Sequence, residues 1–241
     1  MFSSKKNLKK EIKFWAISDD IGSLCPPPYP AKNSIPEWYR KMDKFIGNNN
    51  KLEVYDNGAP NVSLKGCMSF LDTLVSGYII TLHCDILVKQ NEDKTYSMSW
   101  SSVEKPLSPR ALDLVKEIPL VPGFGAFLQA WELKYSMILP KGYTALITQP
   151  LNRYDLPFYA SSGFLDADSP VGPGGIPFAI KDGFEGIIPA GTPILQIIPM
   201  KRESWKMSIA KAPFPQLWNA SPRNKLFGWY KNEIWKKKDF S

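Results

Sequence analysis

Short stretches of alternating or β-branched residues, separated by glycine and proline, dominate the chain from residue 77 to residue 199. The clearest is 77–88, GYIITLHCDILV, which is rich in β-branched residues and is followed by the turn-forming run 91–94. Residues 96–100, YSMSW, alternate apolar and polar side chains, as a half-buried strand does. We therefore expect these two stretches to pair as a β-hairpin.

More strand signals follow at intervals of roughly 8–15 residues, with turn residues between them. They lie at 143–148, 158–164, 176–180, 185–188 and 194–199. This spacing is typical of a sandwich or a barrel. Residues 127–137 fit best as a strand in this setting, although their pattern alone also fits a helix. The chain is therefore predicted to be mainly β, with a few short helices and a C-terminal helix.

Helical signals are short. Residues 35–42 carry a proline near the first turn and predict a helix. Residues 67–74 fit either a helix or a strand, and residues 107–118 fit either a short helix or a loop. The stretch 227–238 predicts a helix with one aromatic side and basic residues elsewhere.

The N-terminal part is rich in proline. Residues 5–15 fit a short amphipathic helix, but a basic tail leading into a strand at 12–17 fits equally well. The prolines in 25–30, CPPPYP, fix φ and keep the backbone extended. This segment is either a rigid strap along the domain, which we favour, or an exposed ligand for a partner.

Composition supports a folded chain in three parts. Hydrophobic residues make up 44% and aromatic residues 13%, which excludes global disorder. We expect an extended N-terminal segment (1–66) packed on a β core (67–212), followed by a basic aromatic tail (213–241). The 22 prolines and 16 glycines leave little room for long helices.

The net charge of +7 is concentrated at the two ends. Residues 1–13 hold five lysines against one glutamate, and residues 223–241 hold six basic residues against two acidic ones, so each end carries +4 and the middle −1. Basic ends indicate docking onto an acidic partner such as nucleic acid, or else solvated tails that keep the protein soluble. No apolar run approaches the ~18 residues that cross a bilayer, so no membrane partner is expected.

Cysteine and histidine do not predict a metal site. Cys25, Cys67 and Cys84 are odd in number and lack a C-x-x-C spacing, and His83 and Cys84, if on one strand, would point to opposite faces. Together with a lysine-rich start after Met1, the cysteines indicate synthesis in a reducing cytoplasm. A single histidine and the lack of a G-x-S-x-G motif leave nucleophilic catalysis unsupported.

Asp166 and Asp168 are the candidate catalytic residues. Two carboxylates at i and i+2 of a strand lie on one face, roughly 6–7 Å apart, where they could activate water or hold a divalent ion. The alternative is a β-turn, in which aspartate is favoured for local hydrogen bonds.

Three segments resemble the dUTPase and dCTP deaminase superfamily: 139–143 (LPKGY), 163–168 (GFLDAD) and 188–196 (IPAGTPILQ). Over residues 139–199 this resemblance implies a β-clip fold, a barrel or sandwich that is usually trimeric. It also implies a hairpin that holds a pyrimidine nucleoside, with Asp166 at the position of the aspartate that acts on water in dUTPases.

This chain departs from that pattern. Ser169 stands where the family has tyrosine, Pro193 stands where it has arginine, and 149–154 replaces the serine-containing phosphate segment. A C-terminal glycine-rich phosphate loop is missing. The resemblance therefore supports the fold more than the activity. The remaining segments resemble an uncharacterised family of tailed phages.

Three functions follow. The first is a non-enzymatic phage structural or assembly protein, without cofactor, found in the bacterial cytoplasm or the virion. It would dock protein partners and further copies of itself through its tail. The tail residues are Trp229, Tyr230, Trp235, Lys236, Lys237 and Lys238. The second is a nucleotide-binding protein or dUTPase-like pyrophosphatase that uses Asp166, Asp168 and Mg²⁺. The third is an accessory protein that binds nucleic acid through both basic termini.

Overall fold

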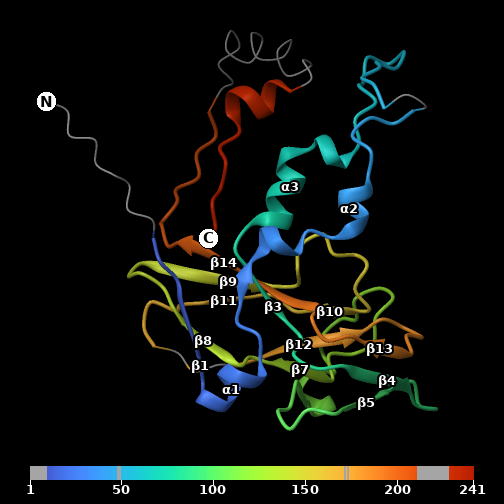
Figure 1. Ribbon diagram of the computed structural model, residues 1–241, viewed down its shortest axis with the longest axis vertical. Coiled ribbons are helices and arrows are strands. Elements are labelled where there is room, and N and C mark those ends of the chain that lie inside the picture. Colours follow the sequence, from blue (N-terminus) through green and yellow to red (C-terminus); the bar gives the residue numbers. More distant parts are fainter. Residues whose placement is uncertain (1–9, 48–49, 171, 173, 211–227) are drawn as a thin grey trace, which may run out of the picture. The chain divides into compact units, whose positions relative to one another are not determined.

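The computed structural model describes residues 10–47, 50–170, 172, 174–210 and 228–241 (Figure 1). The chain forms two compact units. The first combines Met1–Pro30 with Gly77–Arg202, and the second combines Ala31–Ser76 with Glu203–Ser241. The predicted division into an N-terminal segment, a core and a tail stays a prediction.

The first unit is built from antiparallel strands (Figure 1). The strands are β1 (Lys13–Ala16), β2 (Tyr29–Pro30), β3 (Tyr78–Thr81), β4 (Ile86–Gln90), β5 (Tyr96–Trp100), β6 (Leu107–Pro109), β7 (Gln129–Glu132), β8 (Tyr135–Ile138), β9 (Tyr143–Thr148), β10 (Phe158–Ala160), β11 (Gly163–Leu165), β12 (Gly175–Ile180), β13 (Gly186–Ile188) and β14 (Pro193–Lys201). Two short helices accompany them, α1 (Asp19–Leu24) and η3 (Leu112–Leu114).

These strands form four sheets. The largest has the order β11-β9-β14-β3-β2, and the second β10-β12-β7-β6. The other two are β13-β4-β5 and β1-β8. The mainly β prediction is confirmed, and none of the sheets formed by the described residues closes into a barrel.

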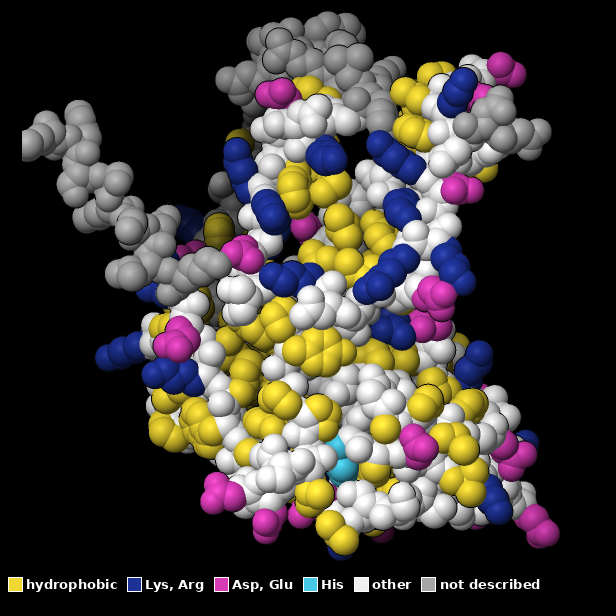
Figure 2. All heavy atoms as spheres, viewed as in Figure 1, with side chains coloured by type: hydrophobic (Ala, Val, Ile, Leu, Met, Phe, Trp, Pro, Cys, Tyr) yellow, Lys and Arg dark blue, Asp and Glu magenta, His cyan; other side chains and the backbone are white. Residues whose placement is uncertain are grey.

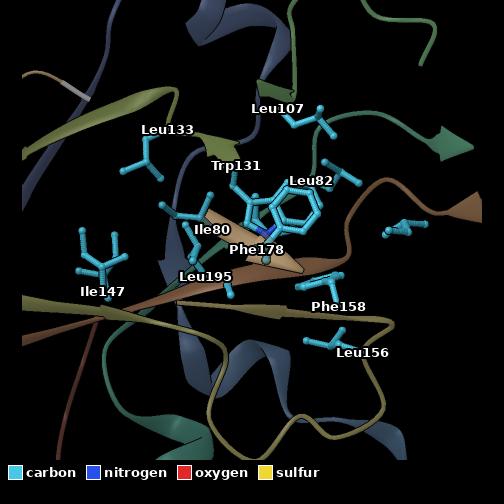
Figure 3. Packing of buried hydrophobic residues seen from close by; sticks show 14 of the residues in the cluster. Ile80, Leu82, Leu107, Trp131, Leu133, Ile147, Leu156, Phe158, Phe178 and Leu195 are labelled. Atoms are coloured by element: carbon cyan, nitrogen blue, oxygen red, sulfur yellow. The ribbon is translucent and has the colours of Figure 1, made fainter. Parts of the chain in front are cut away.

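Aromatic packing fills the centre of the first unit (Figure 3). The Trp131 ring stacks on Phe178 with ring centroids 3.7 Å apart, and Phe158 meets Trp131 edge to face at 5.0 Å. Leu195 and Ile197 of β14 are also fully buried in this cluster. Because each large side chain removed from water stabilises the fold by about 1.5–3 kcal/mol, this cluster anchors the sheets to one another.

Three stretches predicted as single strands are each divided in two. Residues 77–88 form β3 and β4, 127–137 form β7 and β8, and 158–164 form β10 and β11. At each break the chain leaves one sheet and enters another. The breaks at 82–85, 133–134 and 161–162 hold polar residues but no glycine or proline, so the usual signal for the end of a strand is missing.

The first break follows β3. The Leu82 N–H donates to the Thr192 carbonyl at 2.9 Å, and the Asp85 carboxylate accepts from the Ala190 N–H at 2.7 Å. These bonds hold 82–85 outside both sheets. His83 and Cys84 therefore lie in a bend between the two strands, and the expectation that they occupy one strand is wrong.

Other expectations agree more closely. Residues 96–100 form β5, which pairs with β4 as the predicted hairpin. Residues 12–17 contain β1, so the alternative of a strand instead of an amphipathic helix is confirmed there. In the proline-rich segment, Tyr29–Pro30 forms β2 and pairs with β3. Residues 107–118 form a short strand, β6, and the single turn η3, instead of a continuous helix or a plain loop.

Short helices are the main regular elements of the second unit in the described residues, and most of the rest is irregular. Its helices are η1 (Ala31–Ser34), α2 (Glu37–Lys41), η2 (Leu64–Gly66), α3 (Met68–Val75) and η4 (Tyr230–Ile234). Helix α2 lies within the predicted helix 35–42, and α3 shows that 67–74, which fitted either a helix or a strand, is a helix. The Tyr39 and Phe70 rings stack with centroids 5.8 Å apart. No helix in the described ranges is long and apolar enough to cross a membrane.

The predicted C-terminal helix over 227–238 is much shorter in its described part. Only Tyr230–Ile234 is helical, as one π-turn closed by the Trp235 N–H and the Tyr230 carbonyl at 2.8 Å. Gly228 at φ +86° precedes this turn, and Trp235 continues in an extended conformation. A left-handed glycine and an extended residue each end a helix, so the aromatic pattern could not extend it.

Candidate functional site

The two candidate aspartates lie directly after β11, beside the start of β9 and the end of β14. Strand β9 lies between the other two: Leu165 of β11 is opposite Ala145, and Lys201 of β14 is opposite Tyr143. This register brings Asp166 and Asp168 together with Arg202, the residue that follows β14.

Arg202 forms ion pairs with both aspartates. Its Nη1 lies 3.0 Å from Asp166 Oδ1, and its Nη2 contacts Asp168 Oδ2. The Asp166 side chain is 67% exposed, whereas that of Asp168 is 14% exposed. The i, i+2 spacing thus lets one guanidinium meet two carboxylates.

A tight turn before β9 completes the site. The Tyr143 N–H donates to the Pro140 carbonyl at 3.1 Å, and Gly142 has φ +83°, as the third position of a type II turn requires. The Gly142 N–H donates to Asp168 Oδ2 at 2.9 Å. The Gly142 carbonyl accepts the Arg202 N–H at 2.8 Å. One glycine therefore holds both partners of an ion pair.

These contacts lower the pKa of both aspartates. The Arg202 guanidinium, followed by the Thr144 hydroxyl, lowers the pKa of Asp166. The Gly142 N–H, followed by Arg202, lowers the pKa of Asp168. The carboxylates in turn raise the pKa of Arg202. All three groups are charged at neutral pH, and a lowered pKa makes each carboxylate a weaker base.

This arrangement suits structural clamping better than the chemistry predicted for it. A general base works best when its pKa is near the working pH. The pKa of each aspartate is lowered instead, which moves it further from neutral pH. Arg202 already supplies a positive charge between the two carboxylates, and whether they hold Mg²⁺ stays a prediction. No cluster of three or more histidine, cysteine, aspartate or glutamate side chains suited to a metal occurs in the described parts of the chain.

Arg202 was not among the residues that the sequence singled out. The signal that could have found it is the pairing of 194–199 with 143–148. When these two strands pair antiparallel, the end of the second strand lies beside the start of the first. The residue that follows the second strand then lies beside the turn that precedes the first.

A hollow of about 550 Å³ lies elsewhere in the first unit, between the 148–162 segment and Phe124. Tyr154 and Tyr159 line it, but neither candidate aspartate does. Two glutamines fix this segment: Gln149 bonds to the Phe158 carbonyl and the Ala160 N–H, and the Gln196 side chain accepts the Leu151 N–H at 2.8 Å. The segment 149–154 is therefore held by hydrogen bonds within its own chain.

The candidate docking residues of the tail divide into two groups. The Trp235 Nε1–H donates to Asp72 Oδ2 at 2.9 Å, and Lys238 forms an ion pair with the same oxygen. Tyr230, Lys236 and Lys237 are exposed, and Trp229 is half-buried. Trp235 and Lys238 thus hold the tail within the second unit, while partner binding by this set stays a prediction.

The basic termini lie partly outside the described residues, which begin at 10 and omit 211–227. Acidic side chains are interspersed among the lysines and arginines of the face shown in Figure 2, so no continuous basic stripe is visible on it. Whether the termini bind nucleic acid stays a prediction.

No family model and no curated protein matches the chain. Solved structures of two staphylococcal phage dUTPases resemble it. The dUTPase of Staphylococcus bacteriophage 80alpha, solved with dUpNHpp, is 10% identical over 84% of this chain and 97% of that chain, with a TM-score of 0.36. A variant dUTPase from phage phi11 of S. aureus, described with a structural Mg(II) ion, is 11% identical over 67% and 96%, with a TM-score of 0.31. Similarity this low decides neither fold nor activity, so the mainly β assignment stands on the sheets themselves.

Proposed function

We propose that this chain is a non-enzymatic structural or assembly protein of a phage, built on a β core whose acidic motif has a structural role. One observation carries the proposal: both aspartates of the motif are held by Arg202. The phage context rests on the resemblance of the sequence to a family of tailed phages.

We call the contacts of Arg202 with Asp166, Asp168 and Gly142 the clamp. The position of the clamp in the chain suits an assembly role. Arg202 is the last residue of the first unit and follows the last strand of its largest sheet. Holding it by Asp166, Asp168 and Gly142 fixes where the chain leaves the sheet. A protein that docks through the segments after Arg202 needs that point to be rigid.

A nucleotide assay tests this function. The purified chain is incubated with each common deoxynucleoside triphosphate and Mg²⁺, and pyrophosphate release and heat of binding are measured. We expect neither, and we expect Asp166→Asn to change only stability. Mg²⁺-dependent pyrophosphate release that Asp166→Asn abolishes would overturn the proposal.

The alternative is a nucleotide-binding protein or dUTPase-like pyrophosphatase acting through Asp166. One observation favours it: two thirds of the Asp166 side chain is exposed, so a ligand could reach the carboxylate. This function requires Arg202 to release Asp166, and Arg202→Ala should then increase activity. A variant without any gain would count against the alternative.

A nucleic-acid-binding accessory protein is the third candidate. It is supported by the exposed lysines of the described tail, Lys231, Lys236 and Lys237. It predicts an affinity for DNA or RNA that falls steeply as salt rises, with a slope set by the number of phosphates contacted. Binding that is absent at low salt would exclude it.

A further inference from the structure

A row of exposed apolar side chains follows the clamp. Trp205, Met207 and Ile209 are 88%, 85% and 92% exposed. They alternate with Lys206 and Ser208 along a segment without helix or paired strand, drawn in orange after β14 in Figure 1. We call residues 203–210 the arm.

The arm has the pattern of a strand that lacks a partner. Alternation of apolar and polar residues is the signature of a strand with one buried face. Trp205 alone presents about 200 Å² of surface, and single chains rarely leave open an apolar row beyond a few hundred Å². Within the described residues, Trp205, Met207 and Ile209 form no backbone hydrogen bond with another backbone group.

The same chain carries an unprotected sheet edge. Among the strands at sheet ends, β2 and β6 contain proline, β10, β11 and β13 have three residues each, β1 begins with a lysine, and β8 is largely buried. Of the edge strands formed by the described residues, only β5 offers five residues without proline, glycine or charge. Proteins normally protect an open edge with those features, so β5 is the edge best suited to accept a strand.

The backbone of β5 is oriented for such an addition. The Asn91 N–H donates to the Thr95 carbonyl at 2.8 Å, which starts the bonded pairs of the β4–β5 hairpin. Bonded pairs alternate in an antiparallel ladder, so they continue at Lys89 with Ser97 and at Leu87 with Ser99. The N–H and carbonyl of Met98 therefore face the open edge.

The arm cannot reach the β5 edge of its own chain. Trp100 at the end of β5 pairs with Ile86 of β4, and Ile86 pairs with Ile188 of β13. Ile188 comes shortly before the first residue of β14, so this end of β5 lies near the start of β14. The arm leaves from the other end of that strand, whose nine residues span about 30 Å. Three residues from Arg202 to Trp205 cover at most about 10 Å.

We propose that the arm of one chain adds as a strand to β5 of a second copy, with Trp205, Met207 and Ile209 on the apolar face. The arm would extend the sheet β13-β4-β5, on the side where Tyr96, Met98 and Trp100 are half-buried. A segment exchanged between identical chains gives a closed homo-oligomer at little cost. This proposal rests on the proposed assembly function and names the contact between copies.

Light scattering over a range of protein concentrations gives the first test. The full chain is expected to self-associate. The variant Trp205→Ser, Met207→Ser, Ile209→Ser should associate about thirtyfold more weakly, as expected when hot-spot side chains are lost. The matched control changes the other face, with Ser204→Asn, Lys206→Gln and Ser208→Asn, and should keep the mass of the unmodified chain. A full chain that stays monomeric at its highest soluble concentration, or a triple apolar variant that still associates normally, would overturn the proposal.

Photo-cross-linking then identifies the partner surface. A chain with benzoylphenylalanine in place of Met207 is mixed with ¹⁵N-labelled unmodified chain and irradiated. Cross-links to labelled peptides that contain 96–100 are expected, and cross-links only within one chain or to other peptides would refute the β5 contact. The nucleotide assay decides the proposed function separately, because arm exchange does not depend on Asp166.

Discussion

The Arg202 guanidinium forms an ion pair with Asp168, 34 positions earlier in the chain. Only the pairing of β9 with both β11 and β14 brings the two residues together. The pair turns a motif that resembles a catalytic segment into a clamp on the end of a strand. The first two predictions concern this clamp.

Asp168→Asn should destabilise the first unit more than Asp166→Asn does. Asp168 is 14% exposed and also accepts the Gly142 N–H, whereas Asp166 is 67% exposed and its ion pair is screened by solvent. Thermal unfolding of the two variants measures the difference. Equal midpoints would contradict this ranking of the two aspartates.

The clamp should make the protein less stable in acid. Both aspartates have a lowered pKa in the folded state, so the unfolded chain takes up protons first as the pH falls. Their stabilisation is complete above the unfolded-state pKa of about 4 and is lost as the pH falls through the folded-state pKa. Urea unfolding at several pH values should show a shallower acid decline in the Asp166→Asn, Asp168→Asn variant. An unchanged acid decline would contradict this.

Gly77→Ala should prevent folding or cost several kcal/mol. Gly77 has φ +73°, and a Cβ there would lie 2.0 Å from the Ile197 carbonyl oxygen, which belongs to the backbone and cannot move aside. Gly142→Ala is the matched control, because Gly142 has φ +83° with no heavy atom within 4 Å of the added Cβ. The control should lose only about 1–2 kcal/mol, from backbone strain. Soluble yield and urea unfolding of both variants test this, and equal losses would refute it.

Phe178→Ala should destabilise the protein by about 3–5 kcal/mol, because it leaves a cavity beside the stacked Trp131 ring. Phe164→Ala is the control. Phe164 is 70% exposed, so its loss should change stability by no more than about 0.5 kcal/mol. Denaturant unfolding compares the two. A small effect at Phe178 would mean that the core refills the space.

Asp72→Ala should release the C-terminal tail. It removes the acceptor of the Trp235 indole N–H and the partner of Lys238. Limited trypsin digestion should then cut faster at Lys236 and Lys237. Asp56→Ala, at an exposed turn, is the control and should digest like the unmodified chain. Unchanged cleavage in Asp72→Ala would show that other contacts hold the tail.

Local patterns predicted the elements that depend on neighbouring residues. The hairpin of β4 and β5 follows from alternation and a turn, and α2 follows from a proline at a helix start. The division of 77–88 at 82–85 was not predicted, because no glycine or proline marks it and the bonds that hold it reach Ala190 and Thr192, far along the chain. The helix over 227–238 was overestimated, because Gly228 and the contact of Trp235 with Asp72 outweigh the amphipathic pattern.

The sequence by itself determined where most of the strands lie, where glycine allows a turn, and that Asp166 and Asp168 are only two positions apart, although they follow β11 and do not share a strand face. These properties depend on the side chain and on residues a few positions away, so the local sequence is enough to predict them. Only the tertiary structure decided that Arg202 meets both aspartates, because strand pairing joins residues far apart in the chain. It also decided that the row from Trp205 to Ile209 stays exposed while β5 keeps an open edge, since burial depends on what the rest of the chain covers.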